Sequence, residues 1–207
     1  GSGSRGDPGY DGHIKHPDFE VRSREVAAAW EPVDRLQAEL LDLGLPVPRV
    51  IAGGTPTFPF HAAHPQRETS PGTCVLWDTS YAGKYTELDF LFAAVLLTRV
   101  VSKPAGDRVC LDLGYKALAS DWPDPRCWLA ELPRARMVVH SEEHLVVESP
   151  AAERWAVGDV LHAIPYHVCP TVALHERVLA VADRRVVDHW DVAARTRRLS
   201  WESEDGP

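Results

Sequence analysis

Apolar residues recur every three or four positions through the first part of the chain. This is the spacing of one face of an amphipathic α-helix, and it comprises Val26, Ala29, Trp30, Val33, Leu36, Leu40 and Leu41. Gly44 follows this pattern, and glycine commonly follows the last turn of a helix, so we expect the helix to end there. Pro32 lies inside the pattern and should kink the helix or restart it.

A short apolar run, residues 47–52, follows the helical pattern and leads directly into Gly53-Gly54-Thr55. A strand that runs into a glycine turn is typical of α/β structure. A second apolar run, residues 74–77, has the length of one more buried strand. The first part of the chain is therefore predicted to be α/β.

From about residue 88 the pattern changes to short β-rich runs separated by turn signals. The runs cover residues 95–101, 108–113, 137–140, 145–148, 160–164, 178–182 and 186–190. Turn-forming residues separate several of them, as in residues 104–107 and 157–159. The second part is therefore predicted to be a mostly antiparallel β domain.

Composition narrows the classes of function. The 207 residues are 44% hydrophobic and can bury a sizeable core, whereas a formal charge of −8 argues against binding to a nucleic-acid backbone. The longest apolar stretch, residues 88–101, contains Asp89 and Arg99, so no membrane span is expected. No secretory signal is recognised and the four cysteines have no CxxC spacing, so we expect a cytoplasmic protein with reduced thiols.

Three short motifs could carry chemistry. Glycine backbone and a threonine hydroxyl at Gly53-Gly54-Thr55 could hold a phosphate, although a tight turn after a strand would look the same. His13, in Tyr10-Asp11-Gly12-His13, could be a catalytic side chain in a loop or a structural histidine. The segment 141–144 contains two carboxylates and an imidazole, and also has the composition of a solvated hairpin turn.

His167-Val168-Cys169 has the spacing of a pair of metal ligands. In extended backbone, residues two apart point to the same side, so imidazole and thiolate could bind one Zn²⁺ and leave open positions, as in a catalytic site. The alternative is a buried cysteine next to an unrelated histidine.

Read in order, six blocks of the sequence resemble the D-threonine aldolase family, which includes the metal-dependent D-serine dehydratases. The blocks are YDGH (residues 10–13), AGGTPTF (52–58), LDLGYKALASD (111–121), SEEH (141–144), YHVCPT (166–171) and VVDHWDVAAR (186–195). They span nearly the whole chain, and it is their succession that makes the resemblance specific.

The resemblance implies an alanine-racemase-like fold, in which a (β/α)₈ barrel that holds pyridoxal phosphate (PLP) is followed by a β domain. Residues 10–86 would form the closing part of the barrel and residues 87–196 the β domain with a metal half-site. Residues 1–9 would be a linker or disordered, and residues 197–207 a disordered tail. The family also implies a homodimer with shared active sites.

The resemblance also implies roles for individual residues. His13 would be the active-site histidine, Tyr10 would contact the cofactor, and Gly53, Gly54 and Thr55 would bind its phosphate. His167 and Cys169 would bind a divalent metal. Many aldolases of the family have aspartate where Cys169 stands, so this site resembles that of the dehydratases and favours zinc over manganese.

The implied activity is that of a PLP- and metal-dependent lyase acting on D-3-hydroxy amino acids, either by aldol cleavage or by elimination. Two alternatives remain: a non-catalytic metal- or protein-binding remnant of the family, and an amino-acid racemase. The family's cofactor lysine precedes the YDGH block, and residues 1–9 contain no lysine. We therefore expect no imine between PLP and this chain, which would be a fragment, a partner of the missing N-terminal barrel half, or a degenerate relative.

Overall fold

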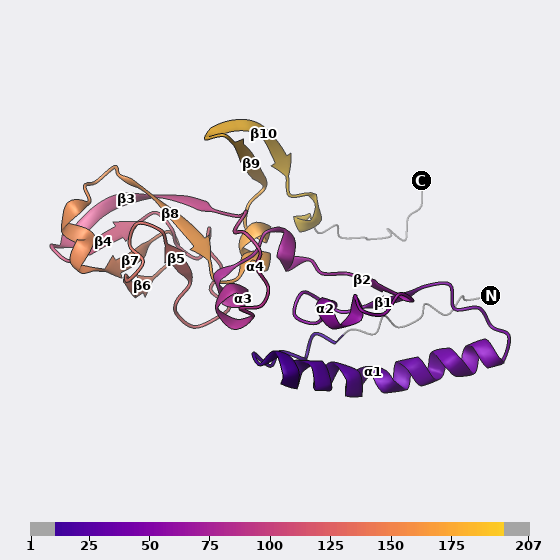
Figure 1. Ribbon diagram of the computed structural model, residues 1–207. Coiled ribbons are helices and arrows are strands. Elements are labelled where there is room, and N and C mark those ends of the chain that lie inside the picture. The colour runs from indigo at the N-terminus through magenta and orange to yellow at the C-terminus, as the bar shows by residue number, and fades with distance from the viewer. Residues whose placement is uncertain (1–10, 197–207) are drawn as a thin grey trace, which may run out of the picture. The chain divides into compact units, whose positions relative to one another are not determined.

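The computed structural model describes residues 11–196. The chain divides into two compact units between Ala93 and Ala94, later in the sequence than the expected boundary between residues 86 and 87. Unit 1 contains the predicted α/β part and unit 2 the β-rich part (Figure 1). The cofactor and metal functions expected of the two parts remain predictions.

Unit 1 begins with the long helix α1, Phe19–Asp42. Asp18 caps its first turn by accepting a hydrogen bond from the backbone of Val21 at 2.8 Å. The helix continues through Pro32, so the expected restart is wrong; the buried side chains of Val26 and Trp30 hold it before that residue. Gly44, with φ +72°, follows the helix in the position that the sequence predicted.

A parallel pair of short strands follows α1, with β1 at Val50–Ala52 beside β2 at Arg67–Thr69. Figure 1 shows the one-turn helix α2, Phe58–His61, between them in the chain. β1 is shorter than the predicted run, because Pro46 and Pro48 have no N–H for a strand ladder. β2 was not predicted, because it is short and polar.

The predicted strand at residues 74–77 is wrong. The segment forms the 3₁₀-helix η1, Thr73–Val75, and then helix α3, Thr79–Lys84. The side chain of Trp77 is buried, whereas that of Val75 is 70% exposed. Trp77 therefore anchors this segment to the interior, and the consecutive apolar residues do not form a buried strand. The core of unit 1 itself comprises Ile14, Val26, Trp30 and Ala52.

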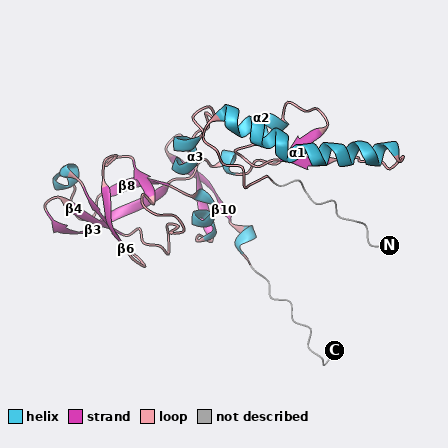
Figure 2. Cartoon of the chain, turned by 90° about the horizontal axis from the view of Figure 1, so that it is seen from below, coloured by secondary structure: helices cyan, strands magenta, loops and turns pink. Residues whose placement is uncertain are grey.

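Unit 2 is built on a six-stranded antiparallel sheet with the order β5-β8-β3-β4-β7-β6. Figure 2 labels β3, β4, β6 and β8 of this sheet. The strands are β3 Leu96–Ala105, β4 Arg108–Leu111, β5 Cys127–Leu129, β6 Arg136–His140, β7 Leu145–Glu148 and β8 Val160–Pro165. The predicted antiparallel domain is thus observed. Of the strands in this sheet, β5 was not predicted, because its three residues give too short a pattern.

The other elements of unit 2 are short. They are η2 Pro150–Arg154, helix α4 Val168–Ala173, the antiparallel hairpin of β9 Arg177–Ala182 and β10 Arg185–Asp191, and η3 Ala193–Arg195. One face of the six-stranded sheet is buried by a cluster of aliphatic side chains that includes Val100, Val109, Leu111, Leu145 and Leu161.

Among residues 11–196, no helix combines the length and apolarity needed to cross a membrane.

Candidate functional site

The segment that carries His13 is a tight turn anchored on both sides. The backbone N–H of Ile14 donates to the carbonyl of Asp11 at 2.9 Å. The side chains of Asp11 and Ile14 are buried, and Ile14 belongs to the core of unit 1. His13 lies between them and is exposed. The buried neighbours therefore fix the backbone of the turn, while the imidazole of His13 is exposed to solvent.

The glycine loop begins where β1 ends. Gly53 has φ +73°, and a Cβ atom there would lie 2.6 Å from Cδ2 of His61, so only glycine fits. The N–H of Gly54 donates to Oγ1 of Thr57 at 3.1 Å, and its carbonyl accepts from Phe58 at 2.8 Å. These bonds fold residues 53–58 into a compact loop.

One side chain joins the histidine turn to the glycine loop. Asp11 accepts a hydrogen bond from Oγ1 of Thr57 at 2.7 Å, across 46 residues of sequence. Its second oxygen accepts from Nε1 of Trp30 at 3.2 Å and contacts Nε2 of His61 at 2.7 Å. Burial by itself would raise the pKa of Asp11, but the hydrogen bonds from His61, Thr57 and Trp30 outweigh burial and lower that pKa.

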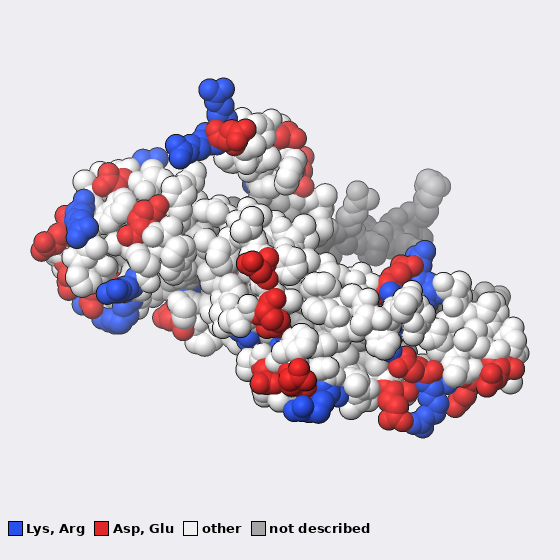
Figure 3. Space-filling view, viewed as in Figure 1, with Lys and Arg blue, Asp and Glu red and all other residues white. Residues whose placement is uncertain are grey.

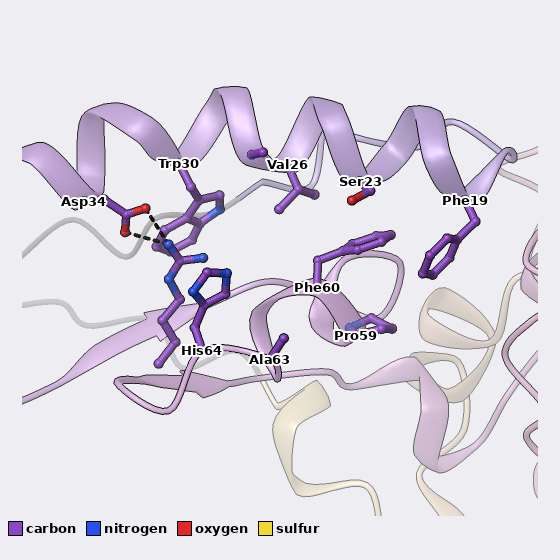
Figure 4. A pocket seen from close by; sticks show the side chains of 11 residues that line it. Phe19, Ser23, Val26, Trp30, Asp34, Pro59, Phe60, Ala63 and His64 are labelled. Atoms are coloured by element: carbon purple, nitrogen blue, oxygen red, sulfur yellow. Dashed lines mark hydrogen bonds and ion pairs between the residues drawn. The ribbon is translucent and has the colours of Figure 1, made fainter.

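His61 is held from its other side by Arg67. Nη1 of Arg67 lies 3.1 Å from Nδ1 of His61. Because a guanidinium only donates, Nδ1 accepts, and the ring proton is on Nε2, which donates to Asp11. Nη2 of Arg67 donates to both oxygens of Asp34, at 2.5 and 2.7 Å (Figure 4). The guanidinium also stacks 4.7 Å above the Trp30 ring.

Arg22 also joins the glycine loop to the segment after His13, through a second set of contacts. Its guanidinium is fully buried and donates to the carbonyl of Pro56 at 2.9 Å and to that of His16 at 2.7 Å. It also pairs with Glu87 and lies 4.6 Å from the centre of the Tyr85 ring. Two separate polar clusters therefore fix the glycine loop against the segment that follows His13.

The glycine loop meets one condition for binding a phosphate. The hydroxyl of Thr55 is buried and, within residues 11–196, has no hydrogen-bond partner, so it can donate to an added oxygen. The N–H of Gly54, in contrast, already donates to Thr57. The following helix α2 has only one turn, so its N-terminus adds little to the binding of an anion. Tyr10, expected to contact the cofactor, lies outside the described residues.

The candidate metal ligands His167 and Cys169 lie at the start of α4 in unit 2. His167 is extended (φ −129°, ψ 104°) and precedes the helix, whereas Cys169 is helical. The premise that both lie in extended backbone is therefore wrong, because Val168–Ala173 forms a helix. Cys169 is exposed, and Nδ1 of His167 lies 2.5 Å from Oδ2 of Asp121. Within residues 11–196 no three His, Cys, Asp or Glu side chains gather as a metal site.

The segment 141–144 forms a hairpin turn, which is one of the two structures that its sequence allowed. The N–H of Ser141 donates to the carbonyl of His144 at 2.9 Å. Both glutamates of this turn pair with Lys116, each at 3.0 Å. On the face drawn in Figure 3, acidic and basic side chains are interspersed over the surface.

Sequence reasoning missed the residues that support the site. Asp11 stands inside the YDGH motif next to His13, but its burial could not be read from the sequence. His61, Arg67 and Arg22 have no characteristic spacing, since their partners are distant in the chain. Only the order of the motifs signals that these segments meet.

Comparison with known proteins matches both units. The family model described as a putative serine dehydratase domain matches residues 93–181. D-threonine aldolase of Arthrobacter sp is 30% identical over 190 residues, which are 90% of this chain and 50% of that protein. 3-hydroxy-D-aspartate aldolase of Paracoccus denitrificans is 29% identical over 204 residues, 92% of this chain and 51% of that protein.

Solved structures agree with these matches. The crystal structure of D-threonine aldolase from Filomicrobium marinum has a TM-score of 0.80 at 26% identity, covering 90% of this chain and 52% of that one. An alanine-racemase-like protein from Idiomarina loihiensis has a TM-score of 0.72 at 20% identity, covering 88% and 54%. The chain thus spans about half the length of these proteins.

Proposed function

Because the chain belongs to the family of the D-threonine aldolases and D-serine dehydratases, we propose that it is the C-terminal part of a lyase for D-3-hydroxy amino acids. In this proposal unit 1 is the closing part of a PLP-binding barrel and unit 2 is the β domain with the metal half-site. The observation that carries the proposal is the 2.7 Å hydrogen bond between Asp11 and Thr57. It draws together the two motifs to which the family resemblance assigns proton transfer and phosphate binding.

The glycine loop would hold the phosphate of PLP. The unpartnered hydroxyl of Thr55 would donate to a phosphate oxygen, and Gly53 and Gly54 would allow that oxygen to approach the backbone closely. When bound, PLP supplies an electron-withdrawing ring that stabilises negative charge at the substrate Cα atom. Asp11, Thr57 and Arg22 would keep the loop in place without contacting the cofactor.

His167 and Cys169 would bind the divalent cation. A thiolate and an imidazole together suit Zn²⁺, and two protein ligands leave positions open for substrate. When bound, the cation supplies a Lewis acid for a hydroxyl oxygen.

His13 would move the proton in the cleavage reaction. Its exposed imidazole would accept the proton of the substrate's 3-hydroxyl as the Cα–Cβ bond breaks, giving glycine and an aldehyde. In the alternative reaction a base takes the Cα proton and the hydroxyl leaves as water, so that hydrolysis gives an oxo acid and ammonia. Cys169, which resembles the second ligand of the dehydratases, favours the elimination.

Product analysis tests the proposal. The polypeptide that carries this chain, purified with PLP and Zn²⁺, would be given D-threonine, D-serine and D-3-hydroxyaspartate, with the L enantiomers as controls. Glycine plus aldehyde identifies an aldolase, and an oxo acid plus ammonia identifies a dehydratase. Conversion to the L enantiomer without cleavage would favour the racemase, and no turnover with both groups bound would favour a non-catalytic remnant. Full turnover after chelation of the metal would overturn the role given to His167 and Cys169.

A further inference from the structure

Residues 167–175, which include helix α4, contact the segment 117–121 through three side chains in a regular series. Nδ1 of His167 lies 2.5 Å from Asp121, Oγ1 of Thr171 accepts from the N–H of Ala119 at 3.2 Å, and Nε2 of His175 lies 2.9 Å from the carbonyl of Ala117. Moving four residues forward within 167–175 thus corresponds to moving two residues back within 117–121. Thr171 lies in α4, His167 is the extended residue that precedes the helix, and His175 follows the C-cap residue Leu174, and all three side chains reach the same neighbouring segment.

The three contacts are not equivalent. Thr171 and His175 bond to the backbone of the segment 117–121 and therefore hold the two stretches of chain together. Thr171 also donates from Oγ1 to the carbonyl of His167 at 2.7 Å, which fixes the start of the helix. The contact between Asp121 and His167 joins two side chains and acts on the ring itself.

We propose that Asp121 is a positioning residue that holds His167 in the tautomer with the proton on Nδ1 and so presents Nε2 to a divalent cation. An ionised carboxylate only accepts hydrogen bonds, so Nδ1 must carry the proton and the lone pair is on Nε2. The pair is partly exposed, with 33% of the His167 side chain and 43% of the Asp121 side chain open to solvent. A carboxylate behind a ligating histidine is the usual arrangement at protein metal sites.

A second acid–histidine pair in unit 2 shows why the first is distinctive. Oε1 of Glu131 lies 2.6 Å from Nδ1 of His162, and its Oε2 accepts from the backbone N–H of the same residue at 2.9 Å. Glu131 therefore braces strand β8 at a backbone position and has a structural use without any ligand. Asp121 has no such backbone bond to His167, and its partner lies two residues before the candidate thiolate Cys169.

The test uses Zn²⁺ titration of the metal-free full chain, with a chromophoric chelator as competitor. The inference rests on the proposed metal pair, so wild type, His167→Ala, Asp121→Ala and the matched control Glu131→Gln are compared. We expect Asp121→Ala to bind Zn²⁺ about 10–100-fold more weakly than wild type, as is typical of lost outer carboxylates. Glu131→Gln should bind as wild type does, and His167→Ala should lose the site.

Nitrogen NMR of the metal-free protein, at a pH where the ring is neutral, provides a readout that a merely structural role would not move. His167 should carry its proton on Nδ1 in wild type and shift toward the Nε2–H form in Asp121→Ala, whereas His175 should not change. If wild type binds no Zn²⁺, the metal pair of the proposed function is refuted, and the tautomer still decides the role of Asp121. An unchanged tautomer together with unchanged Zn²⁺ affinity in Asp121→Ala would overturn the inference. Should that variant fail to fold, Asp121→Ser replaces it, because serine is too short to reach the ring.

Discussion

The Nε2 atom of His61 lies 2.7 Å from Oδ2 of Asp11, and both side chains are buried. Trp30 and Thr57 also donate to this carboxylate, so three donors converge on two oxygens. All three donors share this carboxylate, which connects helix α1, the glycine loop and the turn that carries His13. Asp11 therefore determines the local geometry of the candidate site although it points away from solvent.

We predict that Asp11→Asn destabilises unit 1 by roughly 2–3 kcal/mol. The amide replaces one carboxylate oxygen with an NH₂ group, so a buried donor that bonded to that oxygen loses its acceptor and faces another donor. Urea denaturation followed through the amide signals of unit 1 measures the loss. Thr57→Val should show a smaller loss of the same kind, whereas Thr57→Ser keeps the hydroxyl and should be close to wild type. Equal stability of the valine and serine variants would show that the bond between Asp11 and Thr57 contributes nothing.

The lowered pKa of Asp11 predicts a pH dependence of stability. The folded state holds the proton less tightly than the unfolded chain, whose aspartates have a pKa of about 3.9. The stabilisation from this group is therefore fully present above that value and is lost as the pH falls through the lower folded pKa. Unfolding free energies of wild type and Asp11→Asn, measured from pH 6 downward to about pH 2, should converge at the acid end. Parallel curves would contradict the assignment.

The two glycines of the loop should respond differently to the same substitution. Gly53→Ala places a Cβ atom 2.6 Å from the His61 ring at φ +73°, and we expect a loss of about 1–3 kcal/mol. At Gly54 the nearest atom to a new Cβ is Cδ of Pro56, 3.9 Å away, so Gly54→Ala should be nearly neutral for stability. Thermal unfolding compares the two. Binding of inorganic phosphate is measured for the same two variants. If Gly54→Ala weakens this binding and Gly53→Ala does not, the loop binds anions at the accessible surface of Gly54.

The sequence was most informative where one local pattern sufficed. The hairpin from β3 to β4 turns at Gly106 and Asp107, inside the predicted turn, and β7 matches its predicted residues. The strand predicted at residues 74–77 failed, because apolar letters alone do not distinguish a strand from a turn anchored by Trp77. The expectation that His167 and Cys169 both lie in extended backbone was wrong for a related reason, because helix α4 begins between them, and their pairing as metal ligands stays a prediction.

The support of the site could not be predicted, because it depends on contacts between distant residues. Asp11 meets His61 across 50 positions and Arg67 meets Asp34 across 33. Each of these residues by itself resembles an ordinary surface charge. In contrast, the ordered motifs could be recognised, since each keeps its chemistry within a few consecutive residues.

The last prediction concerns His13, which is exposed and contributes no packing to the core of unit 1. If the chain is part of the proposed lyase, His13→Ala should therefore leave stability and PLP affinity close to wild type. If the imidazole accepts the hydroxyl proton in aldol cleavage, kcat for D-threonine should fall by about 10²–10⁴, as is usual for a lost general base. The matched control is His64→Ala, which removes another exposed histidine of unit 1 and should keep full turnover.

The pH profile separates a role in proton transfer from a role in binding. A general base gives a rate that falls at low pH as its ring becomes protonated, and this limb of the profile should disappear in His13→Ala. A rise in KM with unchanged kcat would instead mean that His13 only helps to bind substrate. Unchanged kcat and an unchanged acid limb would remove His13 from the mechanism and leave the base to be sought among other residues.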